Sequence, residues 1–202
     1  MRALLYFIAI GALTAWHGGR VIGAALFRVP WRRGGVYDTA PRAWGRALLA
    51  ASGIRVRVEG RERIPSVPAV YIANHVSFVD IWVLLQELPG SLRFVFKQEM
   101  MGIPVLGQAL RAGPHISIDR KNQAKAFAAY DDAAKLIQGG ISAAVFAEGT
   151  RSPDGTLRPF KKGPFVLAVA AGAPLVPVHL GGTWAAMPRG AAAPRPGEVT
   201  IR

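Results

Sequence analysis

Short apolar stretches recur along the chain from residue 54 onward, and their spacing is typical of strands. Ile54 to Glu59 alternates β-branched and charged residues, as expected of a strand with one buried face. Ala69 to Ala73 is a continuous apolar run, which suits a strand buried on both faces. The same reasoning predicts further strands at Leu92 to Phe96, His115 to Ile118, Ile141 to Ala147 and Leu175 to Leu180.

Segments with helical spacing lie between these strands. The clearest is Asn122 to Gln138, which is rich in alanine and is followed by two glycines. Strands that alternate with helices usually form parallel sheets, so the pattern predicts an α/β fold whose mixed, largely parallel central sheet is flanked by helices. Residues 181–197 are expected to form a loop, and 198–202 a strand that is either at a sheet edge or interrupted by the end of the chain. The other predicted helices are Pro41 to Ala51, Ser77 to Leu88, Val105 to Arg111 and Phe160 to Ala171.

The first 35 residues contain two apolar runs separated by a glycine pair. Ala3 to Trp16 would span about 21 Å as a helix, short of the roughly 30 Å hydrocarbon core of a bilayer. Gly18-Gly19 is expected to end this helix, and Val21 to Phe27 to form a second one. We therefore expect a membrane-associating helical hairpin over residues 1–35, followed by an α/β domain over residues 36–202. A signal peptide and one transmembrane helix through both runs are the alternatives.

Positive charge is concentrated in this same part of the chain. The whole sequence carries 25 Lys and Arg against 12 Asp and Glu, a formal net charge of +13. Residues 1–63 hold eleven arginines and three acidic residues, so +8 of that charge lies in the first third. This charge favours an anionic partner, and a mean hydropathy of +0.25 favours membrane lipid over nucleic acid. The absence of cysteine excludes a disulfide scaffold, thiol catalysis and Cys-based zinc sites.

The first motif with recognisable chemistry runs from Asn74 to Asp80, with the sequence Asn-His-Val-Ser-Phe-Val-Asp, directly after a predicted strand. Ligands of open α/β sheets bind at the carboxyl ends of strands, where His75 is expected. Asp80 can reach the imidazole and hold one nitrogen, which leaves the other as a general base. Because cysteine and a nucleophile-elbow serine are both missing, the base would activate a hydroxyl of the substrate itself. A buried hydrogen bond that only caps the helix is the alternative.

The second motif is Glu148-Gly149-Thr150-Arg151-Ser152, directly after the predicted strand that ends at Ala147. A glycine lets the backbone approach a ligand, two hydroxyls are available, and Arg151 offers a planar fork suited to phosphate. Lys161 and Lys162 follow within a dozen residues, and Arg120 ends another predicted strand. Basic groups gathered at strand ends indicate a phosphate pocket; a solvated loop with incidental charge is the alternative.

The two motifs together resemble the glycerolipid acyltransferases, specifically the bacterial 1-acyl-glycerol-3-phosphate acyltransferases. The resemblance rests on Asn-His-x-Ser-x-x-Asp followed about seventy residues later by Glu-Gly-Thr-Arg-Ser, and it extends from about Gly53 to Leu180. Further matching blocks are Phe96-Lys97-Gln98-Glu99, Ile118-Asp119-Arg120, Phe160-Lys161-Lys162-Gly163 and Val176-Pro177-Val178.

The resemblance implies transfer of a fatty acyl group to the sn-2 hydroxyl of lysophosphatidate in phospholipid biosynthesis. Acyl-CoA or acyl-acyl carrier protein would be the co-substrate, with no other cofactor and no metal. His75 would be the catalytic base and Asp80 its orienting partner, while the arginines of the substrate pocket would hold the phosphate. The resemblance also implies a place in the inner (cytoplasmic) membrane, with the site facing the cytoplasm. The substrate-binding residues that it implies are Lys97, Arg120, Glu148, Gly149, Thr150 and Arg151.

Three other functions are weighed against this one. Acyl transfer to a different lyso-lipid, such as lyso-ornithine lipid, would use both motifs and differ only in headgroup contacts. A non-catalytic basic protein of the membrane surface would explain the charge and the N-terminus but neither motif. Nucleic-acid binding would explain the charge alone, since no nucleic-acid-binding module is recognisable, and nucleic acid is not an expected partner.

Overall fold

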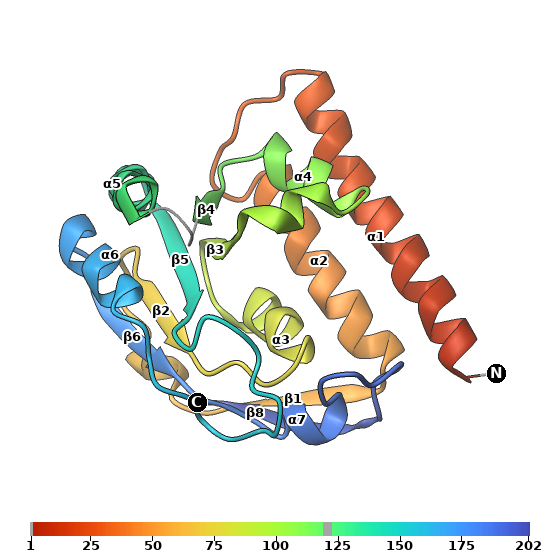
Figure 1. Cartoon of the computed structure of the whole chain (residues 1–202). Helices are drawn as coiled ribbons and strands as arrows, with labels where there is room; N and C mark the ends of the chain where they lie inside the picture. The colour runs from red at the N-terminus through yellow and green to blue at the C-terminus, as the bar shows by residue number, and fades with distance from the viewer. Residues whose placement is uncertain (1, 119–122) are drawn as a thin grey trace.

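The fold is an α/β arrangement built on a parallel sheet, as expected (Figure 1). The computed structural model describes residues 2–118 and 123–202. Within these ranges five strands form a sheet in which every neighbouring pair is parallel. In spatial order they are β4 (Ile116–Ile118), β3 (Ser91–Lys97), β5 (Ile141–Phe146), β2 (Val70–Ala73) and β6 (Leu175–Val178).

The central strand β2 shows how the sheet is covered on both faces. Val70 and Ile72 point to one side and pack with α5 (Gln123–Gln138) and α6 (Gly163–Ala171). Tyr71 points to the other side and packs with α3 (Val79–Glu87). All four residues of β2 are buried, which is the physical reason for the unbroken apolar run in the sequence.

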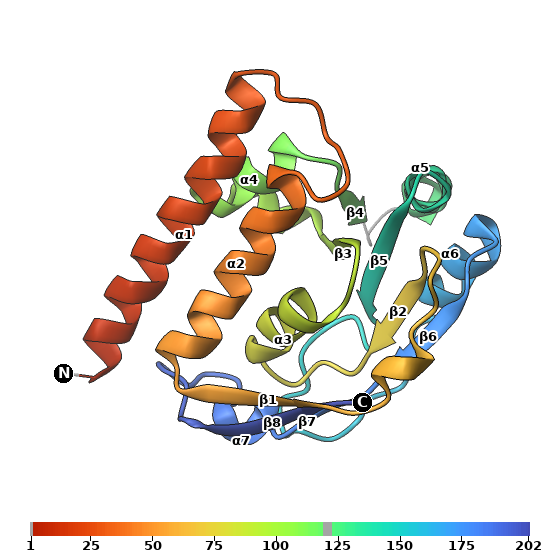
Figure 2. The ribbon, with the colours of Figure 1, turned by 180° about the vertical axis from the view of Figure 1, so that it is seen from behind.

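A second, smaller sheet lies below the carboxyl end of β2 (Figure 2). It consists of β1 (Ile54–Val58), β8 (Gly197–Ile201) and β7 (Leu180–Gly181), with β8 between the other two. The expectation that residues 198–202 form an edge strand is therefore wrong. The predicted strand Leu175 to Leu180 is in fact two strands in two sheets, because the chain crosses from β6 to β7 at His179.

Residues 181–197 were expected to form a loop, but part of the segment is helical. They contain the one-turn helix α7 (Thr183–Ala186), in which Thr183 and Ala186 are buried. Three further short helices lie in the described ranges: η1 (Arg61–Arg63), η2 (Gln98–Gly102) and α4 (Leu106–Ala112).

The N-terminal region departs most from the sequence expectation. One continuous helix, α1, runs from Arg2 to Leu26, so the expected break at Gly18-Gly19 and the expected pair of short helices are both wrong. A Cβ atom on Gly18 would lie 2.8 Å from Cγ1 of Val105, so this glycine permits close contact between α1 and the start of α4. Packing of that kind outweighs the intrinsic helix penalty of glycine, about 1 kcal/mol per residue.

A helical hairpin is nevertheless present, but it is formed by α1 and α2 (Val36–Ala51) and not by two short helices within residues 1–35 (Figures 1 and 2). α1 packs along α2, which lies in what was expected to be the α/β domain. Tyr6 and Val21 are buried on the inner face of α1, and Trp44 of α2 donates a hydrogen bond to Thr14. The hairpin is thus packed into the fold. None of the helices in the described ranges is long and apolar enough to span a bilayer.

A buried aspartate joins the hairpin to the central sheet. Asp38, in the first turn of α2, accepts hydrogen bonds from the Ser91 hydroxyl, from Nη2 of Arg93 at 2.8 Å and from the Gly34 amide at 2.8 Å. Burial opposes ionisation of this carboxyl, but the hydrogen bonds from Ser91, Arg93 and Gly34 outweigh burial and lower its pKa. The ionised form of Asp38 therefore stabilises the folded chain.

Asp38→Asn should lower the free energy of unfolding at pH 7 by about 3–5 kcal/mol, because Arg93 loses its buried partner. The stability from a carboxyl with a lowered pKa is complete above its unfolded value of about 3.9 and is lost as the pH falls through the folded value. Urea unfolding between pH 7 and pH 3 should accordingly show a smaller acid-dependent loss in the variant than in the wild type.

The matched control is Asp132→Asn, which removes a carboxylate that is 76% exposed and paired only at the surface. It should change the free energy of unfolding by less than about 1 kcal/mol. Equal effects of the two substitutions would contradict the role assigned to Asp38.

Candidate active site

The two sequence motifs meet at the carboxyl ends of neighbouring parallel strands. β2 ends at Ala73 and leads through His75 into α3, while β5 ends at Phe146 and leads into the segment around Arg151. Ala73 and Phe146 are register partners, so both loops leave the sheet at the same level. The two motifs thus lie together at one edge of the sheet, as their strand-end positions predicted.

His75 and Asp80 form a hydrogen-bonded dyad. Nδ1 of His75 lies 2.9 Å from Oδ2 of Asp80. The same oxygen accepts the backbone N–H groups of Val76 and Ser77, each at 2.8 Å. Because an ionised carboxylate only accepts hydrogen bonds, this geometry assigns the proton of the neutral imidazole to Nδ1 and leaves the lone pair on Nε2. Asp80 thus both caps the turn and orients the imidazole of His75.

The imidazole of His75 is fixed on its flat side as well as at its edge. Its ring stacks on Phe146 with a centroid distance of 3.7 Å and an interplanar angle of 11°. The side chain is 13% exposed, whereas Asp80 is completely buried. An imidazole with two constraints on its orientation would lose little entropy when a ligand binds beside it.

Glu148 connects the two motifs through their backbones. Its carboxylate is buried, and Oε1 accepts the N–H of His75 at 2.7 Å while Oε2 accepts the N–H of Arg158 at 3.0 Å. The carbonyl of His75 in turn accepts the N–H of Ser152 at 2.8 Å. Glu148 therefore fixes the backbone of His75 relative to that of Arg158.

Gly149 turns the chain sharply after Glu148. Its φ of 76° lies in the left-handed region that favours glycine. Its N–H donates to the carbonyl of Phe146 at 3.0 Å, which closes the turn. Thr150, the next residue, is half-buried. The turn brings Arg151 back toward the first motif.

Arg151 lies over the aromatic ring of Phe78, with its Cζ 3.8 Å from the ring centroid. Burial lowers the pKa of Arg151, and the nearby positive charge of Arg189 lowers it further, while Asp80 acts in the opposite direction. This guanidinium group is thus held beside the dyad in a partly desolvated position, where an anion would be bound strongly.

Asn74 anchors the first motif to the small sheet. Its Nδ2 donates to the carbonyl of Leu180 at 3.0 Å, and its Oδ1 accepts the N–H of Leu180 at 2.8 Å. The hydroxyl of Ser77, another residue of the first motif, donates to the carbonyl of Met187 at 2.8 Å. The sequence motif contained both residues, but only the structure shows that they hold the small sheet and the α7 region against the dyad.

Two of the expected substrate-binding residues cannot be placed beside the dyad. Lys97 is the last residue of β3, and its side chain lies outside the described part of the structure, as does all of Arg120. Their expected roles stay predictions. Arg189 and Phe146 were not singled out from the sequence: a lone arginine in a Pro- and Gly-rich segment, and a phenylalanine in a strand, carry no local signal of function.

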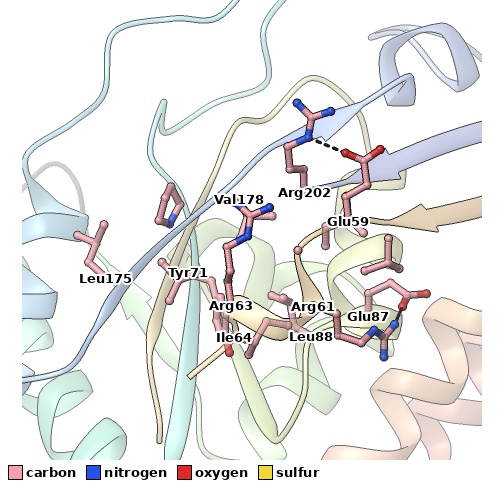
Figure 3. A pocket seen from close by; sticks show the side chains of 15 residues that line it. Glu59, Arg61, Arg63, Ile64, Tyr71, Glu87, Leu88, Leu175, Val178 and Arg202 are labelled. Atoms are coloured by element: carbon pink, nitrogen blue, oxygen red, sulfur yellow. Dashed lines mark hydrogen bonds and ion pairs between the residues drawn. The ribbon is translucent and has the colours of Figure 1, made fainter. Parts of the chain in front are cut away.

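Two cavities flank this region without containing the dyad itself. One, of about 380 Å³, is lined by Asn74 and Val76 on either side of His75 and by Trp184. The other, of about 240 Å³, lies beside β6 and holds mainly apolar side chains such as Tyr71 and Leu175 (Figure 3).

Most charges at the rim of this second cavity are already paired. Arg61 donates to Glu87 at 2.6 Å, and Arg202 donates to Glu59 at 2.8 Å (Figure 3). None of the expected site residues whose side chains the structure describes lines this cavity. The site defined by the two motifs is therefore separate from it.

The fold and the dyad define a class of protein: an α/β protein that presents a carboxylate-oriented histidine at the carboxyl edge of a parallel sheet. The family model described as Acyltransferase matches residues 55–181, and the chain belongs to this family.

Similar proteins in other organisms carry a common name. The 1-acyl-sn-glycerol-3-phosphate acyltransferase of Cocos nucifera is 33% identical over 183 residues, which are 88% of this chain and 58% of that protein. The protein of the same name from Limnanthes douglasii is 34% identical over 200 residues, 96% of this chain and 69% of that protein. The chain thus spans only part of the length of these relatives.

A crystal structure supports the same relationship in three dimensions. The 1-acyl-sn-glycerophosphate (LPA) acyltransferase PlsC from Thermotoga maritima is similar over 100% of this chain and 85% of its own, with a TM-score of 0.69 and 26% sequence identity. The α/β fold with a mostly parallel sheet is shared with that enzyme.

Glu148→Gln should lower the free energy of unfolding by about 1–3 kcal/mol, because an amide cannot accept both backbone N–H groups and leaves one of them unpaired. Glu62→Gln is the matched control, since that side chain is 74% exposed, and it should change stability by no more than about 0.5 kcal/mol. Urea unfolding of both variants is the measurement. A Glu148→Gln variant as stable as wild type would contradict the bridging role of the carboxylate.

Proposed function

We propose that this chain transfers a fatty acyl group from an acyl thioester to the sn-2 hydroxyl of lysophosphatidate and so forms phosphatidate. The donor is acyl-CoA or acyl-acyl carrier protein. The observation that carries the proposal is the 2.9 Å contact between Nδ1 of His75 and the buried Asp80, with Arg151 held beside it. The names of the relatives support the same reaction.

The dyad accounts for the proton transfers of this reaction. Nε2 of His75 accepts the proton of the substrate hydroxyl as the hydroxyl oxygen attacks the thioester carbonyl carbon. The imidazolium that forms is stabilised by the carboxylate of Asp80. When the carbon–sulfur bond breaks, the departing thiolate takes the proton from Nε2, and the products are the new ester and a free thiol.

Arg151 accounts for selection of a phosphate-bearing acceptor. Its stacking on Phe78 leaves the edge of the guanidinium plane available for a bidentate pair of hydrogen bonds to phosphate. Phe78 follows His75 in the same loop, so a phosphate on Arg151 brings the rest of the acceptor close to the base. Lysine could not replace this arginine fully, because an ammonium group lacks the planar fork.

Membrane association is the second part of the proposal. The outer face of α1 exposes large apolar side chains, including Ile8 at 59% and Trp16 at 68%, while the inner face is packed into the fold. Arg20 and Arg28 follow at the carboxyl end of the helix. An apolar face with flanking cations is the pattern of a helix that lies in the headgroup region of an anionic membrane. We place the enzyme at the cytoplasmic face of the inner membrane.

His75→Ala should lower the rate of acyl transfer by about 10²–10⁴-fold, because the variant lacks the imidazole that would accept the proton of the substrate hydroxyl. The assay is lysophosphatidate with acyl-CoA, scored for free thiol and for phosphatidate. The control is His115→Gln, since His115 lies at the amino end of β4, an edge strand of the five-stranded sheet, whereas the dyad follows the carboxyl end of β2. Wild-type activity of His75→Ala would contradict the base assignment, and formation of thiol without phosphatidate would point to a different acceptor.

Ile8→Gln combined with Trp16→Gln should weaken binding to anionic vesicles by about a hundredfold or more, since each large apolar side chain contributes about 1.5–3 kcal/mol on burial. Flotation is the measurement. Val169→Gln is the control, because Val169 is 83% exposed on α6, on the far side of the sheet from α1 (Figure 1). Unchanged flotation of the double variant would contradict the docking face assigned to α1.

A further inference from the structure

The turn that follows α7 carries an arginine which neither motif contains. Arg189 is exposed, two residues after Met187. The carbonyl of Met187 accepts the hydroxyl of Ser77 at 2.8 Å, and Ser77 lies between His75 and Phe78 in the first motif. The side chain of Arg189 therefore starts from a backbone that is attached directly to the catalytic loop.

The connection between this region and the second motif is also close. Trp184 of α7 packs on Gly155, where an added Cβ atom would lie 3.0 Å from the indole ring. Gly155 belongs to the segment that follows Arg151. The α7 turn is thus held between the two motifs that build the site.

The charges of Arg151 and Arg189 interact unfavourably when no anion is bound. Burial and then the field of Arg189 lower the pKa of Arg151. Asp80 is the acidic group that acts on Arg151 in the opposite sense, and its carboxylate already accepts hydrogen bonds from His75 and from two backbone amides. A bound dianion would relieve this repulsion.

We propose that Arg189 and Arg151 bind the acceptor phosphate together, and that Arg189 makes the site selective for a phosphate monoester. A monoester carries a charge of about −1.5 to −2 at pH 7, enough for two guanidinium groups. A diester headgroup carries a single charge and needs only one. Arg189 is in this sense a specificity-determining residue, and the assignment rests on the proposed acyl transfer to lysophosphatidate.

The test compares Arg189→Gln with Arg195→Gln. Arg195 is an exposed arginine in the same connection before β8, so its replacement removes the same charge from the same part of the chain. Initial rates are measured with lysophosphatidate and with lysophosphatidylglycerol as acceptors, and with the acyl-CoA concentration varied separately.

Arg189→Gln should raise the KM for lysophosphatidate by about tenfold to a hundredfold, as expected for loss of hydrogen bonds to a charged group. The kcat, the KM for acyl-CoA and the KM for lysophosphatidylglycerol should change by less than about threefold, so the preference for the monoester falls. Arg195→Gln should leave all four quantities within the same limit.

Three results would overturn the proposal. Equal losses with both acceptors would mean that Arg189 acts only on the fold or on kcat. A higher KM for acyl-CoA alone would assign the arginine to the phosphates of the donor. An equal effect of Arg195→Gln would show general attraction of anions to a basic surface.

Binding measured without turnover separates this proposal from the proposed function. Calorimetric titration of lysophosphatidate into His75→Ala, with and without Arg189→Gln, reports the phosphate site directly. If the wild-type enzyme acylates no lysophosphatidate yet Arg189→Gln weakens this binding about tenfold, the reaction is wrong and the site is right. If Arg189→Gln leaves the binding unchanged, the site is wrong, whatever the activity.

Discussion

The buried charge of Asp80 is the constraint on which the site depends. A carboxylate without exposure to water is tolerated only where donors replace the lost hydration. Here they are the imidazole Nδ1 and two backbone amides from the loop that precedes the helix, all bonded to Oδ2, while the buried Oδ1 has no hydrogen-bond partner among the described residues. Because two of the three donors are backbone groups, the charge dictates the path of the loop, and the orientation of His75 follows from that path.

The rest of the site is assembled around this loop by further contacts to its backbone and side chains. Glu148 accepts the His75 amide, Ser152 donates to the His75 carbonyl, and Asn74 pairs with both backbone groups of Leu180. Two separate parts of the chain, the segment 148–152 and β7, thus hold one short segment. These contacts hold His75, Arg151 and the small sheet in fixed positions relative to one another.

Local pattern was a good guide wherever one interaction dominated. The unbroken apolar run of β2 and the alternation of β1 predicted their strands, and the five-residue spacing of His75 and Asp80 predicted their contact. The acyltransferase family, inferred from two motifs, is confirmed by the family match over residues 55–181.

The errors arose where tertiary contacts decide. Gly18-Gly19 looks like a helix break, yet α1 continues because the glycine at position 18 fits against Val105. The division of residues 175–180 between two sheets, and the central place of β8, depend on pairings with distant strands that no local window contains. Arg189 is near Arg151 only because α7 is folded against the catalytic loop, so no spacing rule could have found it.

The pairing of β1 with β8 has a consequence for the order of events during synthesis. Ile54 pairs with Gly197 and Val58 with Ile201, so β1 leaves the ribosome long before its partner exists. β7, the strand that Asn74 clamps, pairs with the same late strand. Such non-local contacts form slowly, after the local contacts have formed. The nascent chain can complete its central sheet and still lack the support that holds the catalytic loop, so the enzyme becomes competent only once translation has passed β8.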